Sequence, residues 1–102
     1  MKVKVPENIA VGSFDYKIVS VPNLANDYKL LGQSLADSQV IKIEADSTPQ
    51  TKAQVLFHEM VHAISDVYNC ELEEKNIDRI AQGIASVLAR DFGIELSWED
   101  IE

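Results

Sequence analysis

The chain has 102 residues and a formal net charge of −8, from 9 Lys and Arg against 17 Asp and Glu. Hydrophobic residues make up 46% and charged residues 25%, the balance of a soluble globular domain, and this length predicts one domain over residues 1–102. The acidic balance argues against nucleic acid or an anionic membrane as partner, since both select cationic surfaces. The longest uncharged stretch, residues 80–89, is too short to span a bilayer.

The N-terminus and the cysteine content predict a location. No apolar segment follows Lys2 and Lys4, so a secretory signal is not indicated. The single cysteine, Cys70, excludes an intramolecular disulfide and fits a reducing compartment. We therefore expect a cytoplasmic protein.

The first half of the chain, to about Asp46, predicts a small antiparallel or mixed β-sheet. Val3 and Val5 alternate with lysine, and residues 14–21 alternate with a period of two until Pro22. Residues 28–31 form a shorter candidate strand that Gly32 closes. Residues 39–44 form the clearest strand, because Ile41 and Ile43 alternate with charged residues.

The second half changes to a helical period. Ser47 or Thr48 offers an N-cap and Pro49 suits a first turn, so we expect a helix over 49–68. Its apolar stripe contains Ala53, Leu56, Phe57, Met60 and Ile64. A second helix is expected over 72–92, ended by Gly93, with a buried stripe of Ile77, Ile80, Ala81, Ile84, Ala85 and Leu88. A small sheet followed by two helices is an α+β fold.

The two histidines of the chain lie in one motif, His58-Glu59-Met60-Val61-His62, in the middle of the first helix. Side chains four residues apart project from one helical face, so both imidazoles can bind one ion, and imidazole suits Zn²⁺. Glu59 lies about 100° around the helix, beside that ion. There its carboxylate can take a proton from an activated water.

A catalytic zinc needs a third protein ligand, and an acidic residue of the second helix is the better candidate than Cys70. Glu74 and Asp78 border the apolar face of that helix, where a carboxylate is costly unless a cation or hydrogen bonds satisfy it. This favours Glu74 as ligand and Asp78 as an acceptor that orients a histidine. Glu71 and Glu73 stay open as alternatives, although the helix dipole explains both without a metal.

The pattern His58-Glu59-x-x-His62 followed by Glu74-x-x-x-Asp78 resembles the gluzincin zinc metallopeptidases. Its compactness is similar to the minimal ImmA/IrrE-like and phage-associated metallopeptidases, over roughly residues 28–92. The resemblance implies a zincin-like core, zinc on His58, His62 and Glu74, Glu59 as general base, and Asp78 as partner of a histidine.

The resemblance also implies a substrate and a setting. The strand at 39–44 would be the edge strand along which zincins hold an extended peptide. Members of the ImmA-like group are intracellular and associated with phages, where some trigger removal of a repressor, so a repressor-like protein is an expected partner and the host cytoplasm the expected location.

One departure leaves a second function open. Larger gluzincins supply a downstream histidine or tyrosine to stabilise the oxyanion, but no further histidine follows, and Tyr16, Tyr28 and Tyr68 are the substitutes. The alternative to a peptidase is a metal-stabilised regulatory or binding module with little turnover. A nucleic-acid-binding protein is disfavoured by the charge.

Overall fold

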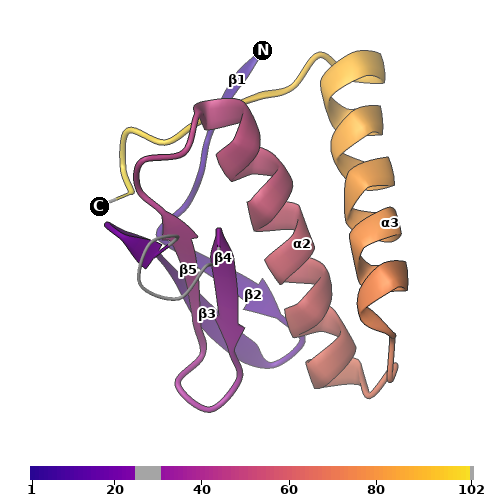
Figure 1. Cartoon of the computed structure of the whole chain (residues 1–102). Coiled ribbons are helices and arrows are strands. Elements are labelled where there is room, and N and C mark those ends of the chain that lie inside the picture. Colours follow the sequence, from indigo (N-terminus) through magenta and orange to yellow (C-terminus); the bar gives the residue numbers. More distant parts are fainter. Residues whose placement is uncertain (25–30, 102) are drawn as a thin grey trace.

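The computed structural model describes residues 1–24 and 31–101, and in this part the chain is an α+β fold of two sheets and two α-helices (Figure 1). The elements, in chain order, are β1 (Lys2–Lys4), β2 (Asn8–Val11), β3 (Phe14–Val21), β4 (Gly32–Leu35), β5 (Val40–Glu44), α2 (Pro49–Tyr68), α3 (Glu74–Ser86), the π-helical turn η1 (Val87–Asp91) and β6 (Glu95–Ser97). The predicted α+β class is confirmed, and the larger sheet precedes both helices as predicted, but β6 follows them and forms a second sheet with β1.

The larger sheet is mixed, with the strand order β2-β3-β5-β4. β2 and β3 are antiparallel, β3 and β5 are parallel, and β5 and β4 are antiparallel. β5 therefore lies inside the sheet, and the prediction that residues 39–44 form an edge strand is wrong. The edge on that side is β4, because a second antiparallel partner covers the hydrogen-bonding groups of β5 that the prediction left free.

Three strands were not predicted, and each lacks a local signal. β2 and β6 are very short, and β4 has the sequence Gly-Gln-Ser-Leu, in which β-branched and aromatic residues are absent. The candidate strand at 28–31 lies mostly outside the described residues. β6 exists through a remote partner, since it pairs in parallel with β1 and brings residues 95–97 beside residues 2–4.

α2 spans the predicted residues and packs on both sides. The Thr48 hydroxyl accepts a hydrogen bond from the Thr51 backbone N–H at 3.2 Å, and Asn69 closes the helix in a left-handed conformation with φ of 56°. Leu56 and Ala63 are buried in the core formed with the sheet, where the largest fully buried side chains include Tyr16, Ile41 and Ile43. Ile64, predicted in the apolar stripe, is instead 40% exposed.

α3 lies beside α2, on the side away from the sheet (Figure 1). It begins at Glu74, two residues later than predicted, and Gly93 follows η1 in a left-handed conformation. Ile77 and Ala81 pack on Val61 of α2. Of the other predicted core residues, Ile80 and Ile84 are more than 40% exposed, and Ala85 and Leu88 are partly buried, because α2 covers only part of the apolar face of α3.

No helix in the described ranges is both long enough and apolar enough to cross a membrane.

Candidate metal centre

The middle of α2 presents His58 and His62 one turn apart, on the side that faces α3 and the β4 edge. Their ring centroids are 5.1 Å apart and the rings are tilted by 54°. The side chains are 21% and 30% exposed, so each imidazole is partly sheltered and still accessible. This follows from the spacing of four residues, which places both side chains on one helical face.

Glu74, in the first turn of α3, closes the group. Its Oε1 lies 2.7 Å from Nε2 of His58, and its Oε2 lies 2.8 Å from Nε2 of His62. One ligand atom from each of the three residues lies within 4.8 Å of the others. We call His58, His62 and Glu74 the His–His–Glu cluster. The packing of α3 on α2 produces this convergence, since Ile77 is buried three residues after Glu74.

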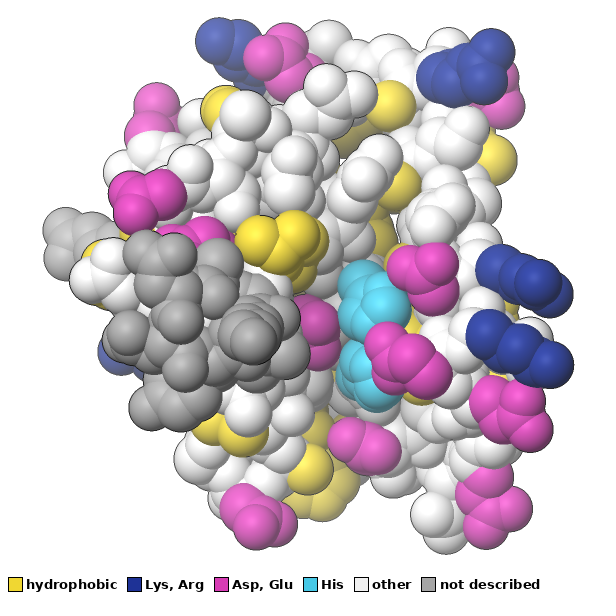
Figure 2. Space-filling model, viewed as in Figure 1, with side chains coloured by type: hydrophobic (Ala, Val, Ile, Leu, Met, Phe, Trp, Pro, Cys, Tyr) yellow, Lys and Arg dark blue, Asp and Glu magenta, His cyan; other side chains and the backbone are white. Residues whose placement is uncertain are grey.

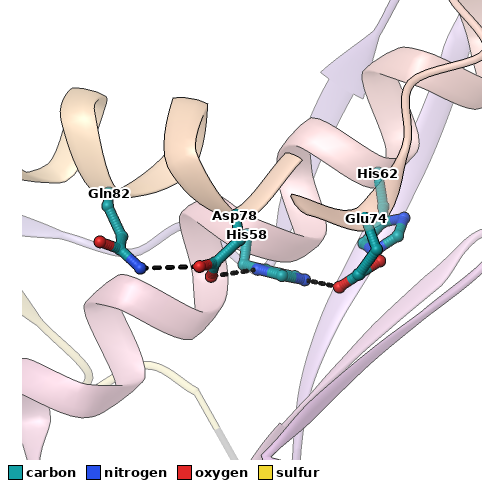
Figure 3. A network of polar contacts seen from close by, with 5 residues as sticks. All are labelled: His58, His62, Glu74, Asp78 and Gln82. Atoms are coloured by element: carbon teal, nitrogen blue, oxygen red, sulfur yellow. Dashed lines mark hydrogen bonds and ion pairs between the residues drawn. The ribbon is translucent and has the colours of Figure 1, made fainter. Parts of the chain in front are cut away.

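A chain of polar contacts extends from the cluster along α3 (Figure 3). Nδ1 of His58 lies 3.3 Å from Oδ1 of Asp78, and the side-chain amide of Gln82 donates to Oδ2 of Asp78 at 2.8 Å. With the proton on Nδ1, His58 would donate to Asp78 and leave Nε2 free as a lone-pair donor toward the cluster. Asp78 therefore lies where the sequence predicted an orienting acceptor.

Glu59 lies beside the cluster and is buried, with only 7% of its surface exposed. Burial raises the pKa of the Glu59 carboxyl, while the neighbouring His58 and a hydrogen bond from the Ser34 backbone N–H act in the opposite direction. A carboxyl with a raised pKa beside two imidazoles is suited to accept and return a proton. Gly32 makes room for it, because a Cβ there would lie 3.2 Å from Cγ and Oε2 of Glu59.

The cluster faces an open cleft between α2, α3 and β4, which we call the metal cleft. In Figure 2 the two histidines lie between acidic side chains on this face of the molecule. The cleft is lined by Leu31, Gly32, Gln33, Ser34, Gln54, Val55, His58, Glu59, His62, Glu74, Asp78 and Ala81. It therefore brings the predicted ligands, the predicted base and an edge strand together.

The alternative metal ligands and the described tyrosines considered as oxyanion stabilisers lie outside the metal cleft. Glu71 and Glu73 are exposed and are not part of the cluster, and the Glu73 carboxylate lies 3.7 Å from Nζ of Lys75. Tyr16 is a core residue of β3 with 2% exposure, and burial raises the pKa of its hydroxyl. Tyr68 is 60% exposed and lies near the Gly12 turn. Tyr28 lies outside the described residues.

Sequence reasoning missed Gly32, Ser34 and Gln82. Gln82 carried a local signal, because it follows Asp78 by four residues on the same helical face. Gly32 and Ser34 carried none, since their contact with Glu59 depends on how β4 meets α2.

The donor set of the cluster fits a zinc ion. Two imidazole nitrogens and one carboxylate oxygen are ligands that zinc accepts, and three protein ligands leave a coordination position for water or substrate. Comparisons of the chain with protein-family models, curated proteins and solved structures gave no match. The residue types and the geometry of the cluster are therefore the basis for assigning a function to this site.

Proposed function

We propose that the protein is a zinc-dependent peptidase that acts on extended peptide segments. The observation that carries this proposal is the His–His–Glu cluster with buried Glu59 beside it, in one open cleft. Zinc at this cluster would supply Lewis acidity, which makes water a nucleophile near neutral pH and polarises a carbonyl. Glu59, beside the cluster, would accept a proton from the attacking water and return it to the leaving amine.

The residues around Glu59 prepare it for this role. Burial raises the pKa of Glu59, which makes its carboxylate a stronger base, and the Ser34 N–H holds the carboxylate in one place. Asp78 and Gln82 hold His58 from the other side. Three side chains would thus bind zinc, Glu59 would transfer the proton, and the residues behind them would orient these groups.

The edge of β4 offers a way to hold the substrate. The Glu44 N–H donates to the Leu31 carbonyl at 2.9 Å, so residues 31 and 33 bond toward β5. The backbone groups of Gly32 and the Ser34 carbonyl face the open edge, while the Ser34 N–H donates to Glu59. A peptide in extended conformation can pair with such an edge through main-chain hydrogen bonds. β4 replaces residues 39–44 in this role.

Metal analysis is the first test. We expect about one zinc per chain in the wild type, loss of zinc in Glu74→Ala, and retention in the matched control Glu71→Ala. Saturation at about 100 times Kd should stabilise the fold by about 2.7 kcal/mol. Loss of zinc in Glu71→Ala alone would contradict the ligand assignment.

Cleavage of a peptide library is the second test. The wild type should hydrolyse peptides, and Glu59→Gln should abolish hydrolysis while it still binds zinc. A metal-stabilised binding module is the other function this cluster supports. Stoichiometric zinc, a large loss of thermal stability on chelation and no hydrolysis of any library peptide would select that module instead.

A further inference from the structure

α3 carries apolar side chains on the side that faces away from the metal cleft. Ile77 is buried against Val61 and marks the contact of α3 with α2. Glu74 lies about 60° around α3 from Ile77, in the direction of the metal cleft. Ile80 and Val87 lie about 60–80° from Ile77 in the other direction. The contact between the two helices therefore separates these apolar residues from the His–His–Glu cluster.

α2 adds to the same side of the molecule. His58 and His62 lie about 60–100° around α2 from the contact residue Val61, toward the metal cleft, and Ile64 lies about 60° from Val61 in the opposite direction. Four large aliphatic residues thus share the side away from the cleft: Ile64, Ile80, Ile84 and Val87, which are 40%, 43%, 41% and 46% exposed. We call these four residues the apolar back face.

The stripe on α3 has the spacing of a helix–helix contact. Ile80, Ile84 and Val87 follow one another at i, i+4 and i+7, so they form one continuous row of about 10 Å, or two helical turns. Such a row packs against the matching row of another helix, and contiguous exposed apolar surface marks a protein contact site. In Figure 1, α3 lies at the outside of the molecule with α2 on one side of it, so a further helix can lie along it.

Two arginines border the apolar back face on its outer edge. Arg79 lies about 100° around α3 from Ile80, on the side away from α2, and Arg90 follows Val87 by three residues on the same edge. Figure 2 shows Lys and Arg side chains along the outer edge of α3. Both arginines are exposed, and among the described residues neither guanidinium forms an ion pair. A partner with carboxylates on this flank would complement their charge.

We infer that the apolar back face binds an amphipathic helix of a partner protein, with Asp or Glu on the flank that meets Arg79 and Arg90. This docking surface is independent of the proposed function, because none of its residues lines the metal cleft. A second copy of the chain is a less favourable occupant. Antiparallel pairing of two α3 helices about a twofold axis would place the arginine edge of one copy against the same edge of the other.

Model helices test this surface with the full chain. Three labelled peptides of about 14 residues, or four turns, would carry leucines in an i, i+4, i+7 row. One has Glu on one flank, the second has Lys in place of Glu, and the third has the leucines scrambled. By fluorescence anisotropy we expect the acidic peptide to bind about tenfold or more tightly than the other two. Ile84→Ser should weaken it about tenfold, and the matched control Phe14→Ser, which removes a side chain of 46% exposure from β3, should not.

A charge reversal tests the chemistry of the partner. Arg79→Glu should weaken the acidic peptide about threefold to tenfold and strengthen the lysine peptide, whereas Lys17→Glu, at an exposed position of β3, should change neither. Titrations with zinc and with chelator keep the result separate from the fate of the metal site. Equal affinity for the lysine peptide would overturn the acidic partner. Equal affinity for the scrambled peptide, no effect of Ile84→Ser, or a wild-type dimer that Ile84→Ser dissociates in sedimentation experiments would overturn the docking surface.

Discussion

The two helices that carry the His–His–Glu cluster are held in different ways. α2 packs on both sides, with Leu56 and Ala63 in the core of the sheet and Val61 against α3. α3 has two buried residues, Ile77 and Ala81, and its ligand Glu74 has a side chain that is 66% exposed. The histidines thus lie on a helix that is well packed on both sides. Glu74 lies on a helix with few buried contacts, and zinc bound by all three residues would link α3 to α2.

Leu56→Ala should have the largest effect, because it opens a cavity where α2 meets the sheet. Leu56 is only 4% exposed, and we expect a loss of about 2–5 kcal/mol in the free energy of unfolding, measured by urea denaturation. The loss should be similar with zinc and with chelator. A much larger loss of stability with zinc than with chelator would show that the packing of α2 on the sheet is also coupled to metal binding.

Ile77→Ala should separate the two helices. Ile77 is 2% exposed and is the main contact of α3, so its truncation should raise amide hydrogen exchange along residues 75–86 while α2 stays protected. Zinc should restore most of the protection and should bind about tenfold or more weakly than to wild type. Equal loss of protection in both helices would show that they unfold as one unit.

Gly32→Ala should disturb the metal cleft from the side of the sheet. A Cβ at this position would collide with Val55 and press on Glu59, so we expect a loss of about 1–3 kcal/mol and a displaced Glu59 carboxylate. Hydrolysis should fall while zinc binding stays within about twofold of wild type.

The control is Gly83→Ala, since nothing lies within 4 Å of a Cβ built there. Alanine in a helix interior should raise stability by about 0.5–1 kcal/mol. Gly32→Ala with wild-type stability and activity would contradict the close approach of β4 to α2.

Glu59→Gln should stabilise the zinc-free protein at neutral pH. Burial raises the pKa of Glu59, so the folded state holds its proton more tightly than the unfolded chain, and stability is lost as pH rises through the folded pKa. The variant has no carboxyl to ionise, so the thermal midpoints of the two proteins should converge below pH 4.5, the ordinary pKa of a glutamate carboxyl. For a domain of this size each kcal/mol moves the midpoint by about 4–8 °C. A lower midpoint for the variant at pH 7 would show that the hydrogen bond from Ser34 outweighs burial.

Glu99→Gln should have the smallest effect. Lys4 lowers the pKa of Glu99 through an ion pair of 2.9 Å, so the pair stabilises the fold above the unfolded pKa of Glu99 and this is lost as pH falls through the folded pKa. Both side chains are more than half exposed, and solvent screens them. The urea midpoint at pH 7 should match wild type within error, and a clear decrease would show that pairing of β1 with β6 depends on this contact.

The sequence by itself determined what depends on neighbours along the chain. The helix over Pro49–Tyr68 was predicted because its apolar period, Thr48 and Pro49 act within a few residues, and β3 was predicted because its alternation is local. The relative placement of His58, Glu59 and His62 follows from helical geometry alone. The same holds for Glu74 and Asp78, whose spacing of four residues puts both side chains on one face of their helix.

Only the tertiary structure decided the sheet order, the edge and the surroundings of the cluster. β5 is internal and β4 is the edge because strand pairing joins residues far apart, and Gly-Gln-Ser-Leu becomes a strand only through that pairing. The packing of Ile77 on α2 brings Glu74 to the histidines and leaves Glu71 and Glu73 outside. The cavity between the N-terminal half of α2 and the C-terminal half of α3 likewise depends on how the two helices pack, which no pattern of neighbours along the chain encodes.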